Sequence, residues 1–313
     1  MLDPQAKRFV ALLAATQPQS VGSLTVSERR DALKKLMRFS GPQEPIGHVE
    51  DRTLPGPAGP MRVRVYSPMG AQADRLPGLV YFHGGGLVAG SVDTHDAIAR
   101  ALANASGCRL VAVDYRLAPE HRFPAAVVDS CSATSWIANH AAEFGIDAQR
   151  LAVCGDSAGA TLAAVVCQSL ACSQDVRIAF QCLVCPIMDF VADTESRRTF
   201  ALGHLIDQET LDHDLLHYLP DGVDLADSRI SPLRADEFSG LPPACIHTAE
   251  CDPVRDEGRA YADRLRLAGV EASYTCHPGM IHLFYGVPAL IPYGRTALEL
   301  IGAEVRAALS CEP

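Results

Sequence analysis

The sequence lacks the features that define several large classes of protein. No apolar run within its 313 residues approaches the roughly 18 residues needed to cross a bilayer. It also contains no internal repeat and no low-complexity tract. Charged residues make up only 20% of the chain and hydrophobic residues 48%, a balance typical of a folded globular protein. A disordered, collagenous or coiled-coil chain is therefore excluded.

Positive charge is also scarce. Lysine and arginine together number 27, whereas aspartate and glutamate number 37, so the formal net charge is −10. A field of that sign repels phosphate backbones and anionic lipid. We therefore expect neither nucleic acid nor a membrane surface as a partner.

Cysteine occurs 11 times, an odd number that does not suggest a disulfide framework. Many of these residues lie inside apolar runs and are expected to be small buried hydrophobes, which favours a reducing compartment and a cytoplasmic location. Cys182 and Cys185 form the closest pair. Their odd spacing within a predicted strand places them on opposite faces, so a zinc or redox site is not expected there.

Short β-branched runs alternate with helix-length segments along most of the chain. Eight runs bounded by Gly and Pro predict strands, at residues 46–49, 63–66, 78–82, 110–113, 151–154, 178–185, 244–248 and 272–276. Between the later runs lie segments expected to be helical, at residues 96–105, 125–144, 158–170, 256–268 and 295–309. This alternation predicts one α/β unit, a mostly parallel eight-stranded sheet with helices on both faces.

Two segments fall outside this alternation. The first forty-odd residues are predicted to be helical, with a helix at 26–39 that opens at Ser27. Residues 189–227 lack strand character and are rich in charged residues and histidine. An insertion of that length between two core strands is usually functional.

The sequence Gly-Asp-Ser-Ala-Gly at 155–159 is the strongest sign of chemistry. It follows an apolar strand and precedes an apolar helix, so it matches the G-x-S-x-G turn in which a serine hydroxyl stands exposed. Ser157 would sit at a helix N-terminus, where free N–H groups favour developing negative charge. We therefore interpret Ser157 as a nucleophile.

Three consecutive glycines provide a second sign. His83 is followed by glycine at 84–86, directly after the run that ends at Phe82. Bare backbone N–H groups of this kind can bind the oxyanion of an acyl-transfer intermediate. His83 itself is interpreted as a hydrogen-bonding support for this loop.

A serine nucleophile needs a base, and the base needs an acid that orients it. Asp252 follows a predicted strand and is the favoured acid, although a helix-capping role for it stays open. Asp189 and Glu250 are rival acids. His282 is the favoured base over His277 because a loop position gives it more reach. Three further histidines are expected to fill or cover the core: His121, His140 and His247.

Taken together, these motifs resemble the hormone-sensitive lipase family of α/β-hydrolases, in its bacterial esterase branch. The matching segments follow the order of the family from about residue 45 onward: 83–86, 114–120, 155–159, 231–233, 252–258 and 279–282. The resemblance implies the α/β-hydrolase fold, with the core at 46–188 and 231–313. It implies a helical cap formed by residues 1–45 and 189–230.

The resemblance also implies the site and its chemistry. The triad would be Ser157, Asp252 and His282, and the oxyanion hole would use the N–H groups of Gly85, Gly86 and Ala158. Residues 115–120 would brace the oxyanion loop. The reaction implied is hydrolysis of small esters with short or medium acyl chains through an acyl-enzyme, without metal or cofactor. A homodimer through an exposed sheet edge is a further implication.

The sequence departs from the family pattern at three positions. Ala160 and Leu283 stand where the family usually has glycine, and Leu87 stands where it usually has an aromatic residue. Leu87, together with Leu205 and Ile206, is expected to shape the substrate pocket. An amidase, lactonase or deacetylase with the same triad remains an alternative, as does a non-catalytic ligand receptor on the same fold.

Overall fold

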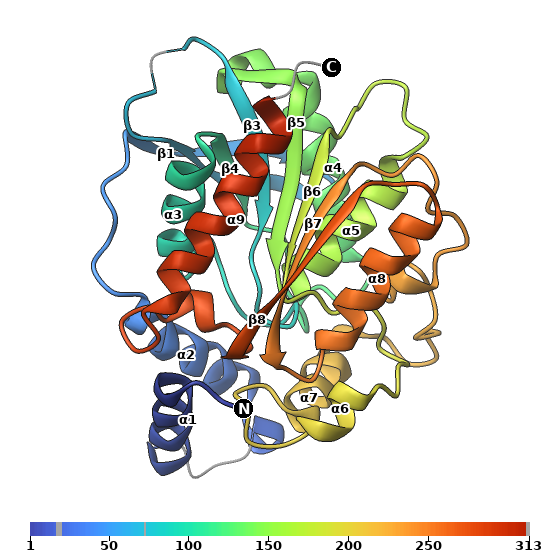
Figure 1. Cartoon of the computed structure of the whole chain (residues 1–313). Coiled ribbons are helices and arrows are strands. Elements are labelled where there is room, and N and C mark those ends of the chain that lie inside the picture. Colours follow the sequence, from blue (N-terminus) through green and yellow to red (C-terminus); the bar gives the residue numbers. More distant parts are fainter. Residues whose placement is uncertain (17–20, 72, 311–313) are drawn as a thin grey trace.

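A twisted sheet of eight strands forms the centre of the molecule. The computed structural model describes residues 1–16, 21–71 and 73–310 (Figure 1). The strand order is β1-β2-β4-β3-β5-β6-β7-β8, and only the β1–β2 and β2–β4 pairs are antiparallel. The strands are β1 His48–Gly56, β2 Gly59–Ser67, β3 Leu76–Phe82, β4 Arg109–Val113, β5 Ile146–Asp156, β6 Phe180–Val184, β7 Ala244–Cys251 and β8 Ala272–Ile281. The predicted mostly parallel eight-stranded sheet is confirmed.

Helices cover both faces of this sheet. One face carries α3 (Asp96–Ser106) and α9 (Tyr293–Ser310), which pack against each other. The other face carries α4 (Ala125–Asn139), α5 (Ala158–Leu170) and α8 (Arg255–Leu267). Each face has its own apolar core, because the parallel strands bury side chains on both sides.

The remaining helices gather at the edge of the sheet where the parallel strands end, at the bottom of Figure 1. They are α1 (Pro4–Thr16), α2 (Val26–Leu36), α6 (Glu195–Thr199) and α7 (Gln208–Tyr218). Short 3-10 helices complete the described chain: η1 Val21–Ser23, η2 Met37–Ser40, η3 Ala141–Phe144, η4 Pro232–Arg234 and η5 Phe284–Gly286. None of the helices in the described ranges has both the length and the hydropathy needed to span a bilayer.

The start of α2 differs from the sequence prediction. Thr25, not Ser27, caps this helix: its hydroxyl accepts a hydrogen bond from the Glu28 N–H at 3.3 Å, and the Glu28 carboxylate accepts one from the Thr25 N–H at 2.8 Å. This reciprocal pair is a capping box, which requires glutamate or glutamine three positions after the cap. Ser27 has arginine at that position, so it lies inside the first turn instead.

A buried ion pair anchors the insertion between β6 and β7 to the core. Arg197 on α6 donates from Nε to Glu257 Oε1 on α8 at 2.6 Å, and both side chains are buried. The second oxygen of Glu257 accepts hydrogen bonds from the backbone N–H groups of Met188 and Asp189, at 2.9 and 3.0 Å. The carboxylate therefore holds both ends of the segment that leads into α6.

We expect Arg197→Met to lower the free energy of unfolding by about 3–5 kcal/mol, because it leaves the Glu257 carboxylate buried without its counterion. The matched control is Arg198→Met, which removes a side chain that is 61% exposed and pairs with Asp193 on the surface. That change should cost less than about 1 kcal/mol. Chemical denaturation of both variants measures the two costs, and equal costs would contradict the anchoring role.

Candidate active site

Ser157 occupies a sharp turn between β5 and α5. Its backbone has φ 53° and ψ −124°, and its N–H donates a hydrogen bond to the Val184 carbonyl oxygen at 2.8 Å. Two residues on, a Cβ atom on Gly159 would overlap the backbone carbonyl of Phe82. Only glycine therefore allows α5 to approach β3 this closely. The turn has the strand–turn–helix geometry predicted from the motif.

Three side chains from the ends of three strands meet at this turn. His282 Nε2 lies 2.9 Å from Ser157 Oγ, and His282 Nδ1 lies 2.8 Å from Asp252 Oδ2. All three side chains are buried, with Ser157 8% exposed. The second oxygen of Asp252 accepts a hydrogen bond from the Val254 N–H at 3.0 Å, and α8 begins only at Arg255. Asp252 is therefore hydrogen-bonded to the imidazole and is not the capping residue of α8.

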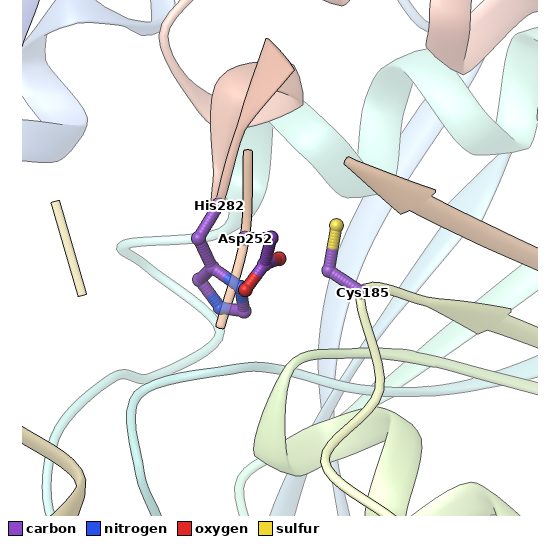
Figure 2. Close-up of side chains that lie close together, drawn as sticks. All are labelled: Cys185, Asp252 and His282. Carbon is purple, nitrogen blue, oxygen red and sulfur yellow. The ribbon is translucent and has the colours of Figure 1, made fainter. Parts of the chain in front are cut away.

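A thiol that the sequence analysis did not assign to the site lies against the same carboxylate. Figure 2 shows Asp252 between the His282 ring and the Cys185 side chain. Burial and the neighbouring Asp252 charge raise the pKa of Cys185 well above its ordinary value, so it stays a neutral thiol. The prediction that Cys182 and Cys185 face opposite ways was wrong. The strand β6 ends at Val184, and Cys185 turns the chain with φ 46°, so both thiols lie in the same core.

His277, the alternative candidate for the base, makes its contacts away from Ser157. His277 belongs to β8, where Nε2 is hydrogen-bonded to His247 Nδ1 at 3.2 Å and Nδ1 to the Tyr293 hydroxyl at 3.0 Å. Burial, reinforced by the nearby His247, lowers the pKa of His277 to about 4. Among the described residues, none of its hydrogen bonds reaches Ser157 or Asp252.

The rival acids are also engaged in other contacts. Asp189 Oδ1 accepts a hydrogen bond from Arg234 Nε at 2.8 Å, and Glu250 Oε2 accepts one from the Gly279 N–H at 2.6 Å. Of the remaining histidines, His247 is buried and His140 is half-buried, as expected. The expectation for His121 was wrong: it lies exposed in a turn that the segment after Pro119 forms before α4 begins.

The glycine loop approaches the same serine. Gly85, Gly86 and Ala158 all line the pocket that contains Ser157 and His282. In the described part of the chain, their backbone N–H groups donate to no protein acceptor. Gly86 has φ 66°, and a Cβ atom there would overlap the carboxylate of Asp214. The loop therefore leaves amide donors free beside Ser157, at a place where only glycine fits.

A buried carboxylate holds this loop from behind. Asp156 Oδ1 accepts hydrogen bonds from the Gly84 N–H at 3.0 Å and from the Tyr81 hydroxyl, and Oδ2 accepts one from the Tyr285 hydroxyl at 3.1 Å. No role for Asp156 was predicted from the sequence. Its position next to the nucleophile, in an otherwise apolar strand end, is the signal that could have identified it.

The histidine before the glycines supports the loop from the other side. His83 is buried, donates from Nδ1 to the Gly84 carbonyl oxygen at 2.8 Å, and stacks on Tyr115 at 4.4 Å between ring centroids. The Tyr115 hydroxyl donates to the His83 carbonyl oxygen at 2.6 Å, and the Ala118 N–H donates to Leu87 O at 2.9 Å. Burial lowers the pKa of His83 to about 3, so it is neutral. The segment at 115–120 therefore braces the glycine loop.

A mostly apolar pocket opens above Ser157, with about 1090 Å³ of empty space including its open mouth. Leu87, Leu205 and Ile206 line it, as predicted, and further apolar walls come from α2 and α7. One ion pair crosses it: Arg29 on α2 donates to Asp214 on α7, with Nη2 and Oδ2 2.8 Å apart. The sequence could not identify this pair because its members are far apart in the chain.

Three leucines on the pocket wall have left-handed backbone conformations. The φ angles are 64° at Leu87, 77° at Leu205 and 60° at Leu283. A non-glycine residue in this region costs about 1–3 kcal/mol. The left-handed conformation at residue 283 is one that glycine adopts without strain, which accounts for the glycine that the family usually has there. Here the strained backbone directs an apolar side chain onto the pocket wall.

Comparisons with known proteins agree with this geometry. Residues 79–286 match a family described by its alpha/beta hydrolase fold. The carboxylic ester hydrolase LipN of Mycobacterium tuberculosis is 40% identical over 294 residues, covering 90% of this chain and 77% of that protein. The arylesterase of Saccharolobus solfataricus is 34% identical over 303 residues, covering 96% and 97%. An ester hydrolase from the metagenome of Lake Arreo, solved with a bipyridine phosphonate derivative, is 40% identical with a TM-score of 0.96, covering 99% of this chain and 100% of that one.

We expect Gly86→Ala to lower kcat/KM by about 10²–10³-fold, because the loop must move away from Asp214 and one oxyanion donor is lost. The matched control is Gly222→Ala. Gly222 has φ 77° but no atom within 4 Å of an added Cβ, so it carries the backbone strain without the overlap. Steady-state kinetics on both variants separates these effects. Equal activity losses would show that the contact with Asp214 is irrelevant.

Proposed function

The chain belongs to the α/β-hydrolase family, and from that premise we propose that it hydrolyses small uncharged esters with Ser157 as nucleophile. It is a carboxylic ester hydrolase. The observation that carries the residue assignment is the chain of contacts from Ser157 Oγ through His282 to Asp252, at 2.9 and 2.8 Å. A hydroxyl, an imidazole and a carboxylate in this order form the arrangement that activates a serine.

The first half of the reaction forms an acyl-enzyme. Ser157 Oγ attacks the ester carbonyl carbon while His282 Nε2 takes its proton. Asp252 holds the Nδ1–H of the imidazole, which keeps Nε2 free as the acceptor and stabilises the imidazolium that forms. The amides of Gly85, Gly86 and Ala158 donate to the carbonyl oxygen as it becomes negative. The imidazolium then protonates the leaving alkoxide, and the alcohol departs.

The second half reverses these roles with water. His282 takes a proton from a water molecule, which attacks the acyl carbonyl carbon and regenerates the same oxyanion. Collapse of this intermediate releases the carboxylic acid and returns the proton to Ser157. The buried position of the three side chains excludes bulk water and strengthens the electrostatic interactions that stabilise both intermediates.

The pocket supports an uncharged substrate. Its wall is mostly apolar, and Arg29 and Asp214 pair with each other there, so neither of these two charges is left to bind a charged substrate group. Burial of each methylene group of an acyl chain against this wall contributes about 0.8 kcal/mol. We infer esters of short or medium acyl length, and the arylesterase among the relatives supports aryl esters as probes.

We also propose that residues 1–45 and 189–230 act together as a cap. The helices α2 and α7 both line the pocket and are joined by the Arg29–Asp214 pair. His213, next to Asp214, is hydrogen-bonded through Nε2 to the Leu24 carbonyl oxygen at 3.0 Å. The homodimer and the cytoplasmic location stay predictions.

We expect Ser157→Ala to abolish turnover of p-nitrophenyl butyrate, with a loss of about 10⁴–10⁶ in kcat, because no other hydroxyl can form the acyl-enzyme. Circular dichroism and thermal unfolding would confirm that the variant is folded. A folded variant that keeps most of its activity would refute the assignment of the nucleophile.

Two matched variants test which histidine is the base. His282→Ala should be about as damaging as Ser157→Ala, whereas His277→Ala should leave kcat within about tenfold of the wild type. Both histidines are buried, so if the loss of a buried ring were enough to reduce activity, both variants would be affected alike. The reverse ranking would overturn the assignment of His282.

The substrate range is measured with p-nitrophenyl esters of increasing acyl length, together with one anilide and one lactone. We expect kcat/KM to peak at a short or medium chain and to be at least about tenfold lower for the anilide and the lactone. A preference for the anilide would make the protein an amidase. A preference for the lactone would make it a lactonase.

A further inference from the structure

We propose that a cluster of thiols, one histidine and one glutamate beneath α9 binds a thiophilic divalent cation such as Zn²⁺. The residues are Cys182, Cys245, His247 and Glu304. They belong to β6, β7 and α9, and none of them takes part in the reaction described above. The cation would join a surface helix to the centre of the sheet.

Cysteines stand side by side on adjacent strands. Cys182 is paired in register with Cys154 on one side and with Cys245 on the other, and all three side chains are fully buried in the core under α9. The Cys182 thiol is within hydrogen-bonding reach of both neighbours. Hydrogen bonding to Cys182, together with burial, raises the pKa values of Cys154 and Cys245 well above the ordinary value, so both are neutral thiols without a cation. The same two hydrogen bonds lower the pKa of Cys182 itself.

An unpartnered nitrogen faces these thiols. His247 follows Cys245 by two residues on β7, so both side chains project from the same face of the strand. His247 is 1% exposed, and its Nε2 has no hydrogen-bond partner among the described residues. A buried polar atom without a partner costs free energy, so it calls for an explanation. A bound cation would supply the missing partner.

The other nitrogen of His247 is held as in a metal site. Nδ1 is hydrogen-bonded to His277 Nε2 at 3.2 Å, and His277 Nδ1 is hydrogen-bonded to the Tyr293 hydroxyl at 3.0 Å. When each Nδ1 carries the proton, every bond in this row has one donor and one acceptor, and the lone pair of His247 Nε2 is free. Burial lowers the pKa of His247, which keeps the ring neutral, as a ligand must be.

Glu304 completes the set from α9. Its Oε1 lies 3.5 Å from His247 Nε2, and its Oε2 accepts a hydrogen bond from the Ser273 hydroxyl at 2.8 Å. The ligand atoms of Cys245, His247 and Glu304 all lie within 4.8 Å of one another, and Cys182, outside that group, lies next to Cys245 on the adjacent strand. Two nitrogen or oxygen ligands at about 2.0–2.2 Å from a tetrahedral zinc ion are roughly 3.4 Å apart. The separation of Glu304 and His247 therefore suits two ligands of one ion.

The donor set selects the class of cation. The proposed donors are two sulfur atoms, one imidazole nitrogen and one carboxylate oxygen, a set that favours Zn²⁺ over Mg²⁺ and Ca²⁺. Binding breaks two S–H bonds and forms two metal–sulfur bonds, and the two protons pass to water. A divalent cation bound by two thiolates and one carboxylate forms a site with a net charge of −1. The carboxylate is that of Glu304, which is half-exposed, so solvent can reach this part of the site.

Co²⁺ tests the proposal because tetrahedral Co²⁺ complexes with thiolate ligands absorb visible light. The full chain is produced in cobalt-supplemented medium and dialysed against a chelator that removes weakly held ions. We expect about one Co²⁺ per chain, a charge-transfer band in the near ultraviolet and d–d bands in the visible. Production with zinc should instead yield about one Zn²⁺ per chain and no colour.

Two variants and two controls identify the ligands. His247→Gln and Cys245→Ser should each lower the amount of bound metal at least tenfold. Loss of a residue that only hydrogen-bonds a metal ligand already lowers metal affinity by about 10–100-fold, so loss of a ligand should cost at least as much. The controls are His140→Gln and Cys167→Ser, which change a half-buried histidine and a buried cysteine outside the cluster and should keep the metal. Unchanged esterase activity would confirm folding of every variant. A wild-type protein without the thiolate bands, or variants that retain them, would overturn the proposal.

Discussion

The site depends on parallel strands that end level with one another. Phe82 pairs with Gly155, Asp156 with Val184, and Cys251 with Ile281, so β3, β5, β6, β7 and β8 finish along one edge of the sheet. Ser157, Asp252 and His282 each directly follow the last residue of such a strand, and the glycine loop follows the end of β3. A shift of two residues in any one register would move a side chain by about 6–7 Å and separate it from the others.

Two buried aspartates at this edge have different tasks because they have different partners. Asp252 faces the imidazole of His282, so in the proposed mechanism it orients and stabilises a group that gains a proton. Asp156 faces hydroxyl and amide donors, so its charge holds a loop in place. Both carboxylates are almost completely buried, and each has the multiple hydrogen bonds that a buried charge requires.

Arginines attach the helical segments to this edge. Arg29 joins α2 to α7 across the pocket, and Arg197 joins α6 to α8. Arg30 donates from Nε to the Val88 carbonyl oxygen at 2.8 Å and from Nη2 to Ala118 O at 3.0 Å, so α2 is bound directly to the segments that flank the glycine loop. The guanidinium group suits this role because it offers several donors in a fixed plane. The walls of the pocket and the oxyanion donors are thus positioned by one set of contacts.

The sequence by itself determined the sheet, the nucleophile turn and the short sets of candidate acids and bases. These follow from local causes: apolar periodicity specifies each strand and helix, and glycine spacing specifies the turns. The loop position favoured His282 over His277 as the base, but the sequence pattern alone could not establish which of the two rings reaches Ser157. Tertiary structure decided that choice, because His277 is still inside β8 and pairs with His247, while His282 has passed the strand end and turns toward Ser157. It also decided the partners of Asp156, the Arg29–Asp214 pair and the thiol beside Asp252. Such contacts join residues far apart in the chain, and only strand register and helix packing bring them within a few ångströms.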